Sequence, residues 1–337
     1  MTSILTNNAA MAALQTLRSL NASMEETQSR VSSGLRVAEA SDNAAYWSIA
    51  TTMRSDNMAI SAVQDAIGLG GAKVDTAYAA MDSAIEVVKE IKAKVVAATE
   101  QGVDRAKIQE EIKQLQEQLV SIAEAASFSG ENWVAGGDDT ENTPLASMVV
   151  SGFVRSAGGT VSVTTTNYTL DATTVGSMTL LFGGVAATGA LSLTTGILGT
   201  VTGDLDGVVD WDNDGTLSEA ATQIAGKSIA TLDVNDAAFI DVAVAMQEAL
   251  TLVEYGLQAM TSAAAALGSI SMRIDLQEDF VSKLSDSIDS GIGRLVDADM
   301  NEESTRLSAL QTQQQLGIQS LSIANSNSEN ILSLFRQ

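Results

Sequence analysis

Residues 74–95, VDTAYAAMDSAIEVVKEIKAKV, contain the pattern that decides the fold. Their apolar residues recur at alternating spacings of three and four, a period near 3.5 that is typical of packed, coiled-coil-like helices. The stripe consists of Val74, Tyr78, Met81, Ile85, Val88, Ile91 and Val95. This stretch therefore predicts a long α-helix that turns one face toward a helical core.

The same alternation extends to both sides of this stretch. We expect a continuous helix over 44–98, weakened by Gly68, Gly70 and Gly71, and a further helix that begins after Gly102 with Asp104 as its cap. Residues 108–126 and 246–295 contain similar stripes. Asp299 and Glu302 then stand at capping-box spacing before a last helix, whose stripe is Leu307, Leu310, Gln314, Gly317, Leu321, Ala324, Ser328, Ile331 and Phe335.

Composition argues against an ordinary enzyme. The 337 residues include no cysteine and no histidine, which removes disulfides, thiolate chemistry and the commonest general base. A net charge of -24 disfavours nucleic acid as a partner. A single proline permits long helices. We expect no cleavable secretory signal in residues 1–20 and no membrane-spanning segment.

The middle of the chain, residues 137–236, has a different composition from the rest. It is rich in Gly, Thr and Val, and short apolar runs at 148–154, 160–165 and 178–183 predict β-strands. Thirteen acids and two bases lie between residues 138 and 241, so we expect an exposed acidic insertion. The fold class predicted is mainly α, with long antiparallel helices from both termini and an inserted β-rich domain.

The two ends of the chain are expected to pack between subunits. Residues 1–34 carry two acids and two bases and no large aromatic side chain, so a lone helix of this kind would be marginal in water. Its stripe consists of Leu14, Leu17, Met24 and Val31. Ends that order only on assembly suit a self-polymerising subunit. The end of this stripe is flanked by Arg30, Gly34 and Arg36. Their pattern predicts either a capped helix end with solvated arginines or a contact between subunits.

Two motifs could indicate small-ligand chemistry. Asp210, Asp212 and Asp214 with Gly215 match the start of a calcium loop, but Ala221 stands where a bidentate Glu is required, so an acidic surface turn is favoured. The glycines at 68–71 lack the lysine and the Ser/Thr of a phosphate-binding loop. We therefore predict no catalytic residue, no metal ligand and no cofactor.

At this point the sequence resembles the bacterial flagellins. The stretches SRVSSGLR (29–36), ASDNAA (40–45) and SIA (48–50) look like the amino-terminal signature of that family. RLVDADMNEE (294–303), QQQLG (313–317), SIAN (322–325) and NILSLFR (330–336) look like its carboxy-terminal signature. The match covers about two thirds of the chain and looks most like the alphaproteobacterial branch.

The resemblance implies a filament subunit with three domains. Residues 1–40 and 299–337 would form an inner coiled-coil domain, 41–136 and 237–298 a helical outer-tube domain with a short hairpin near 127–136, and 137–236 an exposed variable domain. The protein would be exported through the flagellar type III apparatus and assemble outside the cell, with itself, paralogous flagellins, an export chaperone, a cap and hook-junction proteins as partners. The expected self-assembly residues are Leu14, Leu17, Met24, Arg30, Val31, Gly34, Arg36, Leu310, Leu321, Ile331, Leu334 and Phe335.

One segment departs from the family pattern. Many flagellins bind the animal flagellin receptor through an Arg-Glu-Leu core, and the matching segment here is residues 89–96. Lys92 keeps one charge, but Ala93 and Lys94 replace the acid and the leucine, which predicts weak or absent receptor activation.

Three other functions remain as alternatives. A hook-filament junction protein would share the same terminal helices but would not form long tubes alone. A secreted calcium-dependent adhesin would act through Asp210–Asp214. A carboxylate hydrolase would need a buried pair of acids, for which the sequence gives no positive sign.

Overall fold

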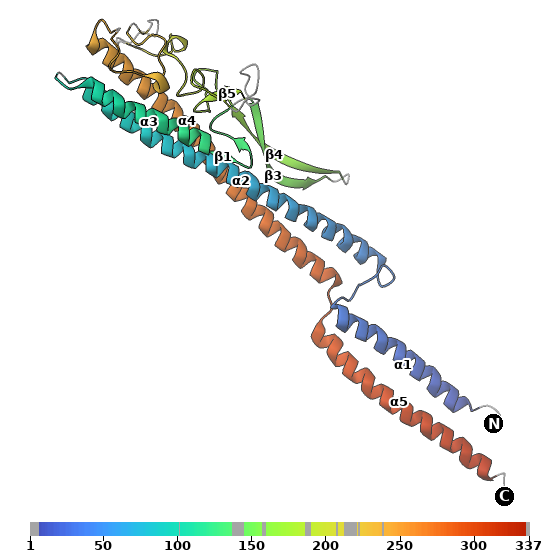
Figure 1. The fold of residues 1–337 in the computed structure, drawn as a ribbon. Helices are drawn as coiled ribbons and strands as arrows, with labels where there is room; N and C mark the ends of the chain where they lie inside the picture. Colours follow the sequence, from blue (N-terminus) through green and yellow to red (C-terminus); the bar gives the residue numbers. More distant parts are fainter. Residues whose placement is uncertain are drawn as a thin grey trace. The chain divides into compact units, whose positions relative to one another are not determined.

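The computed structural model describes residues 7–100, 102–136, 145–156, 160–185, 190–206, 208–211, 221, 223–237 and 239–334 (Figure 1). The chain forms two compact units, Met1–Ala59 with Lys283–Gln337, and Ile60–Ser282. Helices dominate and β-structure lies in the middle of the sequence, which confirms the predicted fold class. The three-domain division expected from the resemblance stays a prediction.

The first unit contains α1 (Asn8–Ser33), α5 (Met300–Leu334) and one end each of α2 (Ala44–Ala98) and α4 (Val242–Val296). The expected continuous helix over 44–98 is confirmed. Asp299 caps α5 as expected, because its Oδ1 accepts hydrogen bonds from the backbone N–H groups of Asn301 at 2.9 Å and Glu302 at 3.3 Å. Asp42 closes the turn before α2 by accepting from the N–H groups of Ala38 and Glu39.

In the second unit the predicted stripes form the helical core. Met81, Val88 and Ile91 of α2 are fully buried, as are Val253, Met260 and Leu267 of α4. Tyr78 is an exception, because Ala77 takes the buried position beside it and the tyrosine ring lies over Gly268 of α4.

Helix α3 (Arg105–Ala125) adds Ile112 and Leu119 to the same core. Asp104 occupies its N-cap position as expected, but its side chain makes no capping hydrogen bond. The Asp104 carboxylate instead lies 3.5 Å from Lys107 Nζ.

A tight hairpin follows α3. Strand β1 (Ser127–Phe128) pairs antiparallel with β2 (Glu131–Asn132), as the resemblance implied. Ser129 and Gly130 both have positive φ, the backbone that a two-residue hairpin turn requires. Trp133, just after the hairpin, stacks on Tyr168 with ring centroids 5.9 Å apart. Burial raises the pKa of Tyr168 to about 12.

The longest strands of the middle region form a two-stranded ribbon. β3 (Leu145–Arg155) pairs antiparallel with β4 (Val161–Leu170), with a bulge between Val150 and Gly152. Both strands extend beyond the predicted runs. The ribbon lies against α2 at Gly70, where an added Cβ would come within 2.1 Å of Val149 Cγ1. This glycine is therefore a docking point rather than only a weak point in the helix.

The third predicted strand was largely wrong. Residues 178–182 are buried but irregular, and only β5 (Gly183–Val185) begins there, paired with β6 (Ala190–Ser192). Backbone hydrogen bonds explain the difference, because the N–H groups of Thr179 and Leu180 both donate to the carbonyl of Asp171. The apolar run reports burial, which an irregular segment can satisfy as well as a strand.

The middle region is also fastened to the helices by polar side chains. Turns η1 (Thr202–Asp204) and η2 (Ile229–Thr231) precede α4. Gln116 of α3 is buried and donates to the carbonyls of Ile229 and Leu232. Glu248 of α4 is buried and accepts from the N–H groups of Gln223 and Ile224. Each side chain supplies partners to buried backbone groups that would otherwise be costly to leave unpaired.

Candidate assembly surface of the terminal helices

Helices α1 and α5 lie side by side and antiparallel (Figure 1). The seam between them follows a heptad alternation on both helices. On α1 the inward positions are Ala10, Ala13, Leu17, Leu20, Met24, Thr27 and Val31. On α5 they are Glu303, Leu307, Leu310, Gln314, Gly317, Leu321 and Ala324. Most of these side chains are only half-buried, so the seam is a narrow contact rather than a closed core.

The expected stripe on α1 is therefore shifted in part. Leu17, Met24 and Val31 lie in the seam, but Leu14 lies outside it and is 43% exposed. Leu20 and Thr27 also occupy inward positions, which the expected stripe did not include. On α5 the predicted stripe holds at every position whose side chain the structure describes, Leu310 and Leu321 included.

Polar side chains fix one register between the two helices. Asn7 donates to the carbonyl of Ala324 at 3.0 Å, near one end of the pair. Gln314 donates to Asn21 Oδ1 at 2.8 Å in the middle. Arg30 reaches the buried Glu303 at 3.3 Å near the other end. Three contacts spread along the seam in one antiparallel alignment disfavour any slip by a helical turn.

The joint predicted at 30–36 is built from contacts within the chain. Gly34 ends α1 with φ +73, and its carbonyl accepts from the N–H of Ala298 at 2.9 Å. The backbone N–H of Arg36 donates to the carbonyl of Val296 at 2.7 Å. Its guanidinium donates to the carbonyl of Leu295 at 3.1 Å. These residues hold α1 and α5 in place, and their contact with another subunit stays a prediction.

Several large apolar side chains are exposed on the α1–α5 pair near the end that carries the termini. Beyond Leu14, sequence reasoning did not select the exposed residues Met11, Leu316, Ile318 and Ile323. They lie on the half of the pair that is nearer the termini, where residues 7–19 contain one charged side chain and residues 307–326 none. These exposed apolar residues could have been identified from the sequence by the lack of charged residues on the outer face of a surface helix.

Some predicted residues cannot be placed. Ile331 and Leu334 lie in α5, but their side chains are not among those that the structure describes. Phe335 and most of the Asp210–Gly215 loop lie outside the described residues. Within the described residues, no three acidic side chains gather as a metal site requires. No helix in the described part of the chain is long and apolar enough to cross a bilayer.

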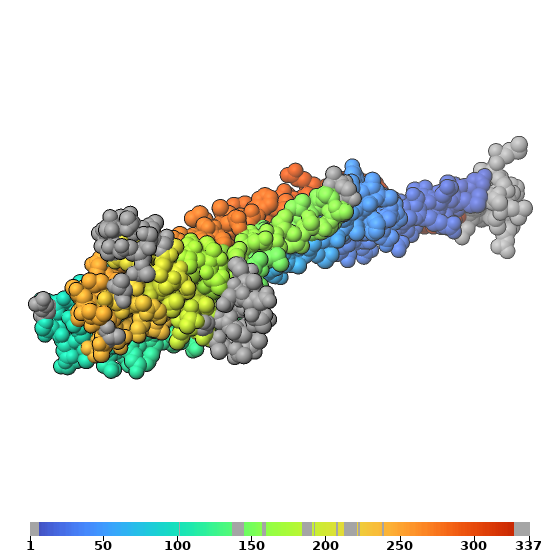
Figure 2. Space-filling view, turned by 90° about the horizontal axis from the view of Figure 1, so that it is seen from above, coloured from blue at the N-terminus to red at the C-terminus, as the bar shows by residue number. Residues whose placement is uncertain are grey.

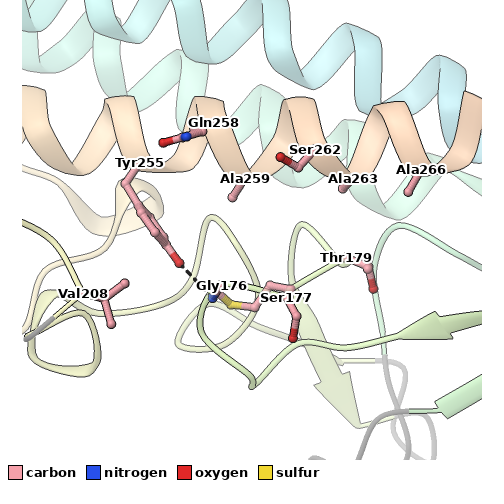
Figure 3. Close-up of a pocket in the computed structure, with 11 residues that line it drawn as sticks. Gly176, Ser177, Thr179, Val208, Tyr255, Gln258, Ala259, Ser262, Ala263 and Ala266 are labelled. Atoms are coloured by element: carbon pink, nitrogen blue, oxygen red, sulfur yellow. Dashed lines mark hydrogen bonds between the residues drawn. The ribbon is translucent and has the colours of Figure 1, made fainter.

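The second unit has a pocket of about 450 Å³ between α4 and the loop at 176–179 (Figure 3). Tyr255 Oη accepts a hydrogen bond from the N–H of Gly176 at 3.2 Å, and burial raises the pKa of this phenol. Gln258 and Ser262 add polar groups above a floor of alanines. None of the lining residues that the structure describes is charged, so this lining offers no carboxylate pair for hydrolysis.

The lysines of the receptor-type segment are paired with acids. Lys92 contacts Glu254 of α4, and Lys94 contacts Glu111 of α3. Lys89 contacts Glu86 at 2.7 Å on its own helix. The segment therefore presents alternating charges of both signs instead of the Arg-Glu-Leu core expected for receptor binding.

Comparison with known proteins gives the family. The bacterial flagellin N-terminal helical region matches residues 4–139, and the bacterial flagellin C-terminal helical region matches residues 250–335. In an alignment 401 positions long, gaps included, the chain is 55% identical to "Flagellin A" of Rhizobium meliloti (strain 1021), and in one 342 positions long it is 51% identical to "Flagellin C" of that strain. The "Flagellin" of Brucella melitensis biotype 1 is 42% identical in an alignment 340 positions long.

Each of these alignments covers all of both chains, and the relatives are alphaproteobacterial, as the resemblance indicated. The two family regions also coincide with the helical parts of the structure at either end of the sequence. The chain therefore belongs to the bacterial flagellin family.

Proposed function

We propose that this subunit of the flagellar filament polymerises through the outer face of the α1–α5 pair, at the end that lacks charge. A flagellin is a structural, extracellular filament protein, so contacts between copies are its function. The observation that carries the proposal is the group of exposed apolar side chains at this end: Met11, Leu14, Leu316, Ile318 and Ile323.

Charge supports this choice of surface. The chain carries a net charge of -24, so copies repel one another wherever acidic surfaces meet. The outer face near the termini carries almost no charge, and covering its apolar side chains would stabilise the contact at ~25 cal/mol per Å². Exposed apolar patches on an otherwise polar protein mark interaction sites.

The residues of the seam have a supporting role in this proposal. Leu17, Met24, Val31, Leu310 and Leu321 hold α1 against α5, so that the outer face exists as one surface. Arg30, Gly34 and Arg36 set the end of α1 through contacts within the chain. By their spacing, Ile331 and Phe335 would continue the seam stripe and Leu334 would extend the outer face, and all three stay in the proposal on the strength of their sequence alone.

The finer partners also belong to this proposal. We expect an export chaperone, a cap and hook-junction proteins as partners, because the family resemblance implies them. The chain is similar over its full length to several flagellins of one organism, which supports mixed filaments with paralogues. No observation favours a junction protein or a calcium-dependent adhesin over a filament subunit.

Seeded polymerisation tests the proposal. The chain with Leu316→Lys and Ile323→Lys is incubated with short filament seeds, and growth is followed by electron microscopy. The matched control carries Ser304→Lys and Thr305→Lys, which add the same charge at exposed positions of the same helix, at the end that already carries charged residues. We expect growth from the control and none from the first variant. Equal growth from both would refute the proposal.

A further inference from the structure

The pocket between α4 and the loop at 176–179 is not used by the polymerisation proposed above. Its lining residues all belong to the second unit, and its volume of about 450 Å³ is in the range of small-ligand sites. In Figure 2 the yellow-green part of the middle region lies beside the orange helix α4, and Figure 3 shows the lining side chains between these two segments. The pocket is therefore a candidate site for a ligand that the filament itself does not require.

The polar side chains of the pocket are neutral and can form further hydrogen bonds. Tyr255 Oη accepts from the N–H of Gly176 at 3.2 Å, so its own O–H points at no acceptor among the described residues. Burial raises the pKa of this phenol, so the O–H keeps its proton at neutral pH. The Gln258 amide and the Ser262 hydroxyl have no hydrogen-bond partner in the described part of the chain, and both can donate and accept.

Apolar groups supply the other half of the lining. Ala259, Ala263 and Ala266 recur on one face of α4 and form a floor without long side chains. The Tyr255 ring stands at one end of this row (Figure 3). The buried Met178 adds apolar surface from the middle region. A ligand in the pocket would therefore meet C–H groups over the floor and hydrogen-bonding groups at the rim.

Charge limits the class of ligand. The chain has a net charge of -24, which repels anions, and the described lining residues include no cation to hold one. They include no carboxylate either, so a cation would lose water without gaining a partner. A purely apolar molecule would cover Gln258 and Ser262 and leave them unpaired. A hexose meets all of these conditions, because its hydroxyls donate and accept around the rim and its ring faces carry C–H groups.

We propose that this pocket binds a neutral sugar unit. Tyr255, Gln258 and Ser262 contact its hydroxyl groups, and the alanine floor of α4 contacts one face of the sugar ring. This inference goes beyond the role as a filament subunit and does not rest on which residues carry polymerisation. The same chemistry is presented by a free sugar and by a unit of a neutral polysaccharide, and the test below separates the two.

Saturation-transfer NMR on the full-length monomer tests the site. The probes are the methyl glycosides of glucose, galactose and mannose, which are neutral hexoses that differ in the orientation of their hydroxyls. We expect at least one of them to bind. The uronate and the amino sugar of the same hexose carry one charge each, and they should bind at least ~10-fold more weakly because the charge would be desolvated without a partner.

Two variants assign the binding to this pocket. Gln258→Ala removes an exposed side chain without a hydrogen-bond partner in the described part of the chain, so the fold should be kept. The loss of its contact with a sugar hydroxyl should raise the Kd ~10-fold. Tyr255→Phe keeps the ring and should raise the Kd by a similar factor. The matched control is Gln247→Ala, at an exposed position of α4 outside the pocket, which should bind like the unchanged chain.

Each outcome decides the proposal or the source of the sugar. No binding of the three glycosides overturns the proposal, as do equal Kd values for the Gln258→Ala and Gln247→Ala chains or equal binding of the charged sugars. Competition by the matching neutral polysaccharide, which is dextran, galactan or mannan, assigns the site to a polymer. Binding of the glycoside without such competition assigns the site to a free sugar. Failure of the polymerisation surface would appear instead in the lysine variants of α5, which leave this pocket unchanged.

Discussion

Replacing Ile323 of α5 by alanine should raise the concentration of subunits needed for polymerisation. The side chain lies on the outer face of α5 and is 65% exposed, so it contributes little to the seam with α1. Alanine keeps the helix, because it has the highest intrinsic helix propensity. The change therefore removes apolar surface that another subunit would cover, and leaves the fold of the monomer nearly unchanged.

The size of the effect follows from the exposed surface. Burying a whole isoleucine side chain is worth ~1.5–3 kcal/mol, so covering the exposed part of Ile323 is worth ~1–2 kcal/mol. Each added subunit brings one such side chain. Because ~1.4 kcal/mol corresponds to a factor of ten in an equilibrium constant, the critical concentration should rise ~5–30-fold.

Sedimentation of seeded filaments measures the critical concentration directly. Gln319→Ala is the matched control, since this exposed side chain of the same helix ends in an amide and has much less apolar surface to lose than isoleucine. An Ile323→Ala chain with the same critical concentration as the control would refute the reasoning. So would a loss of helix in the monomer, which would show that the residue acts through the fold.

Three further predictions concern other parts of the chain. Gly70→Ala should destabilise the monomer toward urea by ~1–3 kcal/mol through overpacking, whereas Gly68→Ala, with open space around it, should stabilise it slightly. The backbone N–H groups of Glu39 and Ala38 donate hydrogen bonds to the Asp42 carboxylate and lower its pKa. The turn before α2 should therefore be fully stable above the ordinary carboxyl pKa of ~3.9, and it should loosen as the pH falls through the lowered pKa of Asp42. Amide hydrogen exchange of the turn measures this loosening. In the Asp42→Asn chain the exchange should no longer depend on pH in this range. The segment 89–96 should give weak or no signal in a reporter-cell assay of the animal receptor, and potency like that of an enterobacterial flagellin would contradict this.

The long helices were predictable because their signal is repeated many times. Seven positions of the stripe over 74–95 set the helix, and one exception such as Tyr78 does not disturb it. The exact face of α1 was less certain from sequence. Residues 12–14 are Ala-Ala-Leu, so neighbouring registers have similar apolar content, and contact with α5 decides between them.

The middle region was harder to predict, for a physical reason. Its short apolar runs report burial, but whether a buried run becomes a strand depends on which backbone groups are available as partners. At 145–170 the chain pairs with itself across a short loop, and the strands are longer than the runs. At 178–182 the partners come from three separate segments, at Asp171, Val134 and Ile197, and no regular strand forms.

The candidate assembly surface was predictable only in part. The heptad stripes revealed the residues that join α1 to α5, because periodicity reports the buried face of a helix. The side chains best placed to meet another subunit, such as Leu316 and Ile323, lie off that stripe. Sequence periodicity does not separate packing within a chain from packing between copies.

The most direct test of the central claim compares the full chain with a version that lacks residues 300–337. Both are purified, incubated with short filament seeds and examined by electron microscopy. If the terminal helices carry polymerisation, the full chain gives long tubes and the shortened chain gives none, although its second unit keeps its helical circular dichroism. Long tubes from the shortened chain would contradict the account.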